Sequence, residues 1–136
     1  MKKGLLPGLT RESGFMATPE MQPAKKDGTL IHPLYSTWSM VRHFEMVGRE
    51  LLEPYLDPDE EAVGYRISVT HSAPSPVGKA VRVRASLKSV KKNRVVCGLE
   101  AYNEAGKIGE GRFTQVVLAK SKLNAKIRRA GGGPQK

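Results

Sequence analysis

Residues 37–53 carry the only pattern of a long helix in this chain, and a single long helix restricts the folds open to it. Large apolar residues recur at helical spacing along one stripe, which consists of Met40, Phe44, Val47 and Leu51. Ser36 or Thr37 can supply the N-cap, and Pro54 ends the pattern because proline cannot continue a helix. An apolar face this wide predicts burial against a sheet.

A second stripe of the same helix includes a residue that does not suit burial. This stripe consists of Val41, Glu45, Gly48 and Leu52. Glu45 is its only charged member, and carboxylates are rarely buried without a partner. Glu45 either pairs with Arg42 or Arg49, which lie at helical offsets from it, or takes part in chemistry.

Outside the helix, the clearest candidate for chemistry is His71, at the end of a strand predicted over residues 64–71. Apolar residues alternate along this strand, and Tyr65, Ile67 and Val69 fall on the face predicted to meet the core. His71 continues that face, and the prolines that follow stop the strand because they cannot donate to its ladder. The ring is either half-buried and satisfied by a backbone carbonyl, or a base at the lip of a sheet.

The rest of the sequence predicts a small α+β domain. Residues 11–18 form a weak first strand, and the proline-rich and glycine-rich residues 19–36 form a loop. Three more alternating segments follow the His71 strand, at residues 81–88, 94–102 and 107–118. We predict that the four strands after the helix form an antiparallel meander around it. One helix covers only part of a sheet face, so we expect a dimer that extends the sheet.

Length and cysteine content limit the class of protein. A chain of 136 residues makes one domain, predicted over residues 1–130, with 19–36 as a lid or a packed loop and 131–136 as a disordered tail. Its single cysteine, Cys97, excludes a disulfide framework and a cysteine-rich zinc site, and its place in a predicted strand favours burial. No apolar run is long enough for a membrane span or a signal peptide, so we expect a cytoplasmic protein without membrane contact.

The net charge of +10 comes from 23 Lys and Arg against 13 Asp and Glu, and it predicts attraction to polyanions. Nucleic acid and a phosphate-rich small ligand both fit this charge. Only 6% of the residues are aromatic, and the basic residues are not interleaved with them, which argues against a nucleic-acid partner. The three histidines, His32, His43 and His71, lack the spacing of metal ligands, so no metal is expected.

Six stretches spread over residues 35–128 carry a family resemblance. They are Thr37 to Glu45, Glu53-Pro-Tyr-Leu-Asp-Pro58, Gly64 with Val69-Thr-His-Ser-Ala73, Leu87-Lys-Ser-Val90, Ile108-Gly-Glu-Gly111 and Asn124-Ala-Lys-Ile-Arg128. In this order and spacing they resemble acyl-CoA thioesterases of the fluoroacetyl-CoA thioesterase type, which have the hot-dog fold. The resemblance implies an antiparallel sheet wrapped around one long central helix, subunits that pair into a homodimer, and hydrolysis of an acyl-CoA or aryl-CoA thioester.

The resemblance also assigns site residues. Thr37, Glu45 and His71 match a catalytic threonine, carboxylate and histidine, and Gly64 matches a glycine of the acyl pocket. The nucleophile is then Thr37, Glu45 or a water, with His71 suited to act as the base. Thr37 and Glu45 are ~12 Å apart if both lie on one helix, so either Thr37 precedes the helix or the site is shared across a dimer interface. No cofactor is expected beyond the coenzyme A part of the substrate.

Two positions depart from the family pattern. Gln115 stands where the fluoroacetyl enzyme has an arginine, and Gly28 and Ile31 stand roughly where its lid has phenylalanines. An aromatic gate is therefore absent, and fluoroacetyl specificity is not inferred. Ile31, Tyr35 and Trp38 are candidate walls of a substrate pocket, with core packing as the other interpretation. The alternative function is a non-catalytic protein of the same fold that binds acyl-CoA or another small ligand.

Overall fold

The structure is a computed structural model that describes residues 1–132. Five strands form one antiparallel sheet: β1 (Thr10–Met16), β2 (Glu60–His71), β3 (Ala80–Lys91), β4 (Arg94–Asn103) and β5 (Gly106–Ala119). The long helix α1 (Thr37–Leu52) precedes β2, and a second helix, α2 (Lys120–Arg129), follows β5. The short 3-10 helices are η1 (Pro19–Met21) and η2 (Glu53–Tyr55).

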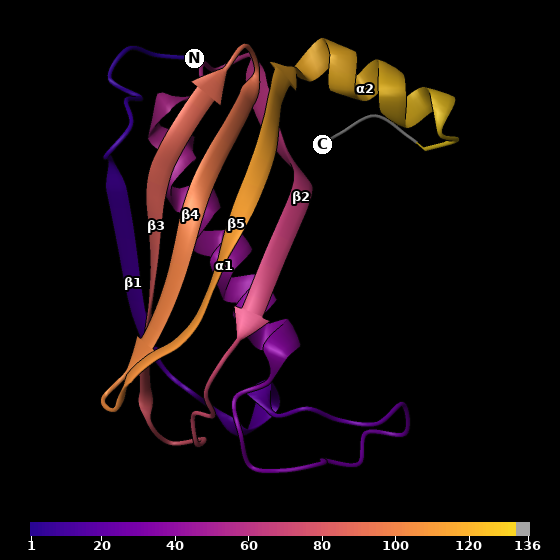
Figure 1. The fold of residues 1–136 in the computed structure, drawn as a ribbon. Coiled ribbons are helices and arrows are strands. Elements are labelled where there is room, and N and C mark those ends of the chain that lie inside the picture. The colour runs from indigo at the N-terminus through magenta and orange to yellow at the C-terminus, as the bar shows by residue number, and fades with distance from the viewer. Residues whose placement is uncertain (133–136) are drawn as a thin grey trace.

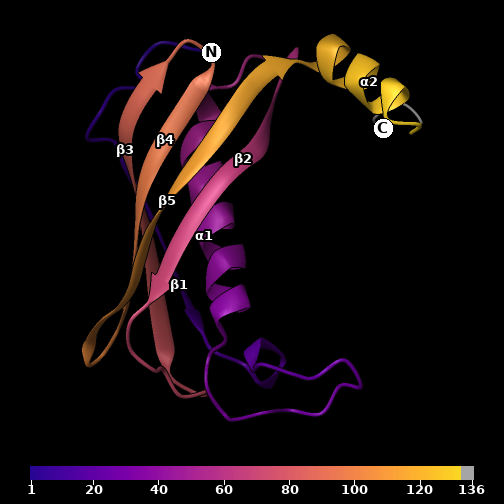
Figure 2. The same cartoon turned by 45° about the vertical axis from the view of Figure 1, so that its right-hand side comes forward.

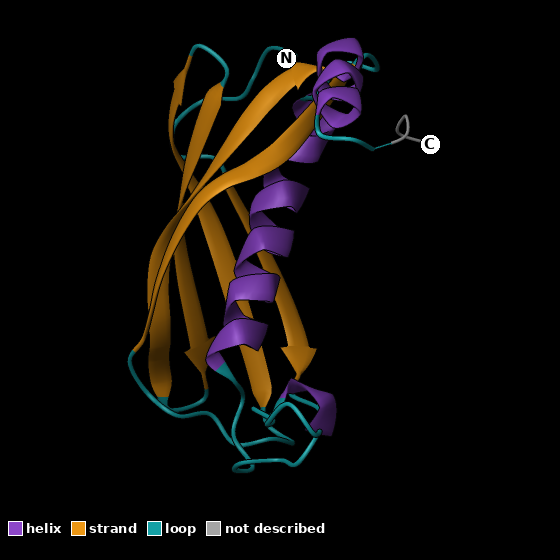
Figure 3. Cartoon of the chain, turned by 90° about the vertical axis from the view of Figure 1, so that its right-hand side faces the viewer, coloured by secondary structure: helices purple, strands orange, loops and turns teal. Residues whose placement is uncertain are grey.

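Helix α1 runs lengthwise along one face of the sheet, and the twisted strands curve around it (Figures 1 and 3). The stripe predicted to be apolar is buried against the sheet, and it consists of Met40, Phe44, Val47 and Leu51. Ser36 caps the helix, because its hydroxyl accepts a hydrogen bond from the backbone N–H of Ser39. The predicted α+β layout with one central helix is therefore confirmed.

The order of the strands differs from the predicted meander. The sheet runs β1-β3-β4-β5-β2, so β3, β4 and β5 follow one another, while β2 lies at the far edge beside β5. Helix α1 connects the two edge strands and carries the chain from β1 across to β2 (Figure 1). Residues 72–79 then return the chain to β3. One edge of β2 consequently has no neighbouring strand within the described chain.

A bulge in β2 makes one side-chain prediction wrong. Gly64 pairs with Gln115 and Arg66 pairs with the next residue of β5, which leaves Tyr65 as an extra residue in the strand. The alternation therefore shifts by one position at this point. Tyr65 was predicted to face the core, but its side chain is 59% exposed, while Ile67 and Val69 beyond the bulge pack against the core.

Two of the glycines of β5, Gly109 and Gly111, allow close packing against neighbouring elements. A Cβ at Gly109 would collide with the side chain of Met40 on α1, and a Cβ at Gly111 would collide with the carbonyl of Ser68 on β2. Gly111 therefore needs a residue without a side chain, because the backbone of β2 cannot give way, whereas a side chain at Gly109 would require Met40 to move.

The C-terminal helix α2 was not predicted. It projects beyond the edge strand β2 (Figures 1 and 2), and its partly buried apolar residues are Leu123, Ala125 and Ile127. Gly131 ends it with φ = 90°, a left-handed value that suits glycine. Residues 131–132 of the predicted tail belong to this turn, and 133–136 lie outside the described residues. No helix between residues 1 and 132 has the length and apolarity needed to cross a membrane.

Candidate active site

The fold brings together two of the residues predicted for catalysis. Thr37 is the first residue of α1, and His71 is the last residue of β2. The Thr37 hydroxyl Oγ1 and the imidazole Nδ1 of His71 are 3.0 Å apart, within hydrogen-bond distance. A hydroxyl and an imidazole in this arrangement can act as a nucleophile and its base.

The two ring nitrogens of His71 have different surroundings. Nδ1 contacts the Thr37 hydroxyl, whereas Nε2 is buried and has no hydrogen-bond partner within residues 1–132. Burial lowers the pKa of His71, and a backbone hydrogen bond at Ala73 opposes this shift. The ring is therefore neutral near pH 7, which is the form that can accept a proton.

A cavity of about 400 Å³, here called the His71 pocket, opens beside this pair. It is lined by Pro23, His32, Leu34, Tyr35, Ser36, Thr37, Trp38, His71, Ser72, Ala73 and Pro74. The loop over residues 19–36 thus forms part of the wall. Its end is fixed, because the N–H of Tyr35 donates to the carbonyl of Ser75 over 2.8 Å and that of Ser36 donates to the carbonyl of Met21 over 2.8 Å.

The predicted substrate-binding residues do not all lie at this pocket. Tyr35 and Trp38 line it, and Trp38 is 54% exposed. Ile31 is also 54% exposed but is not part of the pocket lining. Gly64 lies at a different cavity, between α1 and β2.

Glu45 is exposed and lies in that second cavity, here called the Glu45 groove. The groove has a volume of about 430 Å³ and is lined by Trp38, Val41, Arg42, Glu45, Met46, Arg49, Ala62, Gly64, Phe113 and Gln115. Glu45 faces Gly64, where an added Cβ would lie 3.2 Å from the carboxylate oxygen Oε1. Within one chain Glu45 makes no hydrogen bond with His71, and Trp38 is the residue that borders both cavities.

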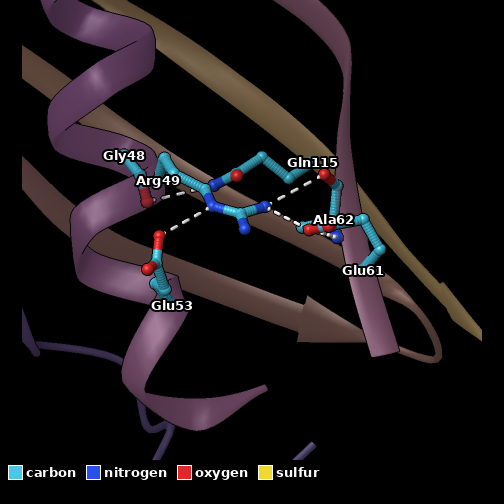
Figure 4. Close-up of polar contacts among 6 residues, drawn as sticks. All are labelled: Gly48, Arg49, Glu53, Glu61, Ala62 and Gln115. Atoms are coloured by element: carbon cyan, nitrogen blue, oxygen red, sulfur yellow. Dashed lines mark hydrogen bonds and ion pairs between the residues drawn. The ribbon is translucent and has the colours of Figure 1, made fainter. Parts of the chain in front are cut away.

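The alternative interpretation, that Glu45 pairs with Arg49, does not match the structure. Arg49 binds Glu53 at 3.0 Å and Glu61 at 2.7 Å, and it also donates to the carbonyl of Ala62 (Figure 4). No ion pair joins Glu45 to Arg42 in the described chain either. The Glu45 carboxylate is thus left open to the groove.

Comparison with known proteins decides the family. A sequence model of the fluoroacetyl-CoA-specific thioesterase family matches residues 17–121. This chain belongs to that family. A fluoroacetyl-CoA thioesterase from Streptantibioticus cattleyicolor is 31% identical over 133 residues, which cover 94% of this chain and 96% of the relative.

Solved structures agree with this assignment. A thioesterase superfamily member from Thermus thermophilus superposes with a TM-score of 0.90 at 37% identity, over 95% of each chain. A point mutant of the fluoroacetyl-CoA thioesterase in complex with acetyl-CoA superposes with a TM-score of 0.83 at 28% identity, over 92% of this chain and 98% of that one. The chain has the hot-dog fold and is a thioester hydrolase, as the sequence resemblance implied.

The departure from the family pattern at Gln115 has a structural role here. Its amide is buried on β5 and donates to the carbonyl of Gly48 on α1 over 3.1 Å (Figure 4). The side chain therefore ties the sheet to the helix instead of presenting a charge to the groove. Arg112 lies on the opposite, exposed side of β5, as the alternation predicted.

Sequence reasoning missed one residue beside the site. His43 was considered only as a metal ligand, but its Nδ1 lies 2.7 Å from the hydroxyl of Tyr35, a wall of the His71 pocket. Tyr35 precedes α1 and His43 lies within it, eight positions later. Because only one of the two is helical, no periodic pattern in the sequence indicated this bond. Within residues 1–132, no three His, Cys, Asp or Glu side chains gather closely enough to hold a metal ion.

Proposed function

We propose that this thioesterase hydrolyses acyl-CoA or aryl-CoA thioesters at the His71 pocket. The observation that carries the proposal is the 3.0 Å contact between the Thr37 hydroxyl and the neutral imidazole of His71, at the wall of a 400 Å³ cavity. The substrate class is supported by the family relative that acts on fluoroacetyl-CoA and by the related structure with acetyl-CoA.

In the proposed reaction, Nδ1 of His71 accepts the proton of Thr37 as its Oγ1 attacks the thioester carbonyl carbon. The carbon–sulfur bond then breaks, and the imidazolium gives its proton to the departing thiolate of coenzyme A. Water, deprotonated by the same imidazole, then attacks the threonyl ester; the bond between the acyl carbon and Oγ1 of Thr37 breaks, the imidazolium returns its proton to Oγ1, and the acid is released. The first-turn N–H groups of Thr37 and Trp38 lack intrahelical acceptors and are available to the oxyanion.

We further propose that the enzyme is a homodimer and that Glu45 completes the site of the other subunit. Thr37 and Glu45 are ~12 Å apart along α1, too far for both to reach one carbonyl within a chain. The open edge of β2 offers a strand for pairing. The exposed side chains of Trp38 and Met46, at 54% and 46%, border the Glu45 groove, which also includes Ala62 and Gly64 of β2. A two-fold axis at β2 would bring the Glu45 of each copy toward the Thr37 end of the other.

Protein groups and water suffice for this reaction, and coenzyme A enters only as part of the substrate. The phosphates of coenzyme A suit a chain with a net charge of +10, which supports this ligand over an uncharged thioester. A cytoplasmic location stays a prediction of the sequence.

The test is release of free thiol from a panel of short-chain, medium-chain, long-chain and aryl-CoA thioesters. We expect turnover of at least one class, with production of one acid for each thiol. Calorimetric titration on the same panel separates hydrolysis from binding. Tight binding of an acyl-CoA without any thiol release would support the alternative, a non-catalytic binding protein. The absence of both binding and turnover across the panel would refute the proposed substrate class.

A further inference from the structure

The bond between Tyr35 and His43 lies within a small aromatic cluster beside the His71 pocket. Tyr35 is 1% exposed, and its hydroxyl lies 2.7 Å from Nδ1 of His43 on α1. Phe15 of β1 stacks on the His43 ring, with centroids 4.0 Å apart and an interplanar angle of 29°. The cluster therefore joins the first strand, the end of the loop and the helix.

Both partners of this hydrogen bond are uncharged near pH 7. Burial raises the pKa of Tyr35 far above its usual value, so the phenol keeps its proton. Burial, helped by the neighbouring charge of Arg42, lowers the pKa of His43, so the ring is neutral near pH 7. Either partner can donate, according to which ring nitrogen of His43 carries the proton. The Tyr35 hydroxyl is committed to His43 and is not available to a substrate.

Tyr35 also contacts the proposed base and the segment behind it. Its ring meets the ring of His71 edge-on, at 6.2 Å between centroids and 65° between planes. Its N–H donates to the carbonyl of Ser75, four residues beyond His71. The orientation of the Tyr35 ring therefore determines the surface against which the imidazole of His71 rests.

We propose that Tyr35 and His43 form a positioning pair, in which His43 fixes the Tyr35 ring and the ring holds His71 in contact with Thr37. This inference rests on the proposed role of Thr37 and His71. Neither member of the pair touches the reacting atoms. The pair is needed because Nε2 of His71 has no hydrogen-bond partner in residues 1–132, which leaves ring packing to support that side of the imidazole.

Three substitutions test the pair. Tyr35→Phe removes the hydroxyl and keeps the ring, His43→Leu removes the hydrogen-bonding ring nitrogen, and His43→Asn places an amide, which can accept or donate, near the position of Nδ1. We expect the first two to lower kcat about fivefold to tenfold with KM changed by less than about twofold, since one hydrogen bond of ordinary strength is lost. We expect His43→Asn to restore most of the loss. Tyr102→Phe is the matched control, because the Tyr102 hydroxyl donates to Glu100 on the sheet. We expect this substitution to leave kcat unchanged.

Two further readouts separate positioning from a general loss of stability. The ¹⁵N resonance of His71 Nδ1 reports its contact with Thr37, and we expect it to shift in Tyr35→Phe and His43→Leu but not in Tyr102→Phe. Thermal melting of the same samples gives the folded fraction. A drop in kcat that only follows the folded fraction, with the His71 resonance unmoved, would overturn the proposal. Full kcat in both variants would overturn it as well, while loss of activity in His71→Ala would still support the proposed function.

Discussion

The separation of Thr37 from Glu45 on α1 leads to a complementation experiment. The two residues are eight positions apart, so they differ by ~12 Å along the axis and by about 80° around it. If one site takes Thr37 from one chain and Glu45 from the other, a mixed dimer of Thr37→Val with Glu45→Gln subunits contains one site with both defects and one intact site. Its expected kcat is about half that of the wild-type dimer.

The two homodimeric variants set the baseline for this measurement. Loss of a nucleophile or of an acid–base group typically costs about 10²-fold to 10⁴-fold, so each variant alone is expected to be nearly inactive. The subunits carry different affinity tags, are produced together and are purified over both tags in turn. Thiol release from one acyl-CoA then gives kcat for each dimer.

A mixed dimer of Thr37→Val with His71→Ala subunits is the matched control. Those two residues meet within one chain at 3.0 Å, so each of its sites has one defect and no activity returns. If the Thr37→Val and Glu45→Gln mixture were no more active than its parent variants, the shared site would be refuted.

Three other predictions concern pH, packing and thiol reactivity. Because burial lowers the pKa of His71 below 6.5, neutral imidazole persists to lower pH, and the acidic limb of kcat/KM should have its midpoint below pH 6.5; a midpoint above it would contradict the assigned base. Gly48→Ala places a Cβ 2.7 Å from the Phe113 ring. Overpacking costs ~1–3 kcal/mol, against a helix-propensity gain of at most ~1 kcal/mol, so urea denaturation should show a net loss of stability. An unchanged denaturation midpoint would oppose this reasoning. Cys97 is fully buried with its pKa raised to about 11, so a thiol reagent should label it only after denaturation, and rapid labelling of folded protein would be inconsistent with that burial.

Local patterns predicted the helix and the inward faces of the later strands, because both depend on residues close in sequence. The stripe from Met40 to Leu51 fixes which side of α1 meets the sheet. The neighbours of each strand depend on where the helix carries the chain, so the position of β2 at the far edge was not predictable from alternation. The bulge at Tyr65 was not predictable either, because the apolar alternation of the sequence continues through it.

The candidate site was predicted by family resemblance more than by pattern. Thr37 and His71 are 34 positions apart, and only the crossing of α1 from β1 to β2 brings them together. Glu45 was singled out by its place on an apolar stripe, but its role and those of Gly64, Ile31 and Trp38 stay predictions. The bond between Tyr35 and His43 depends on the exact path of the loop into α1, which no periodicity encodes.

The most direct test of the central claim compares Thr37→Ser with Thr37→Val on the best acyl-CoA substrate. Serine keeps a hydroxyl near His71, whereas valine keeps the shape and loses the hydroxyl. Thr70→Val, an exposed threonine beside His71 on β2, is the control and should retain full activity. The account predicts that Thr37→Ser retains measurable turnover, while Thr37→Val loses about 10²-fold or more in kcat, as His71→Ala does. Wild-type kcat in Thr37→Val would contradict the assignment of the Thr37 hydroxyl as the nucleophile.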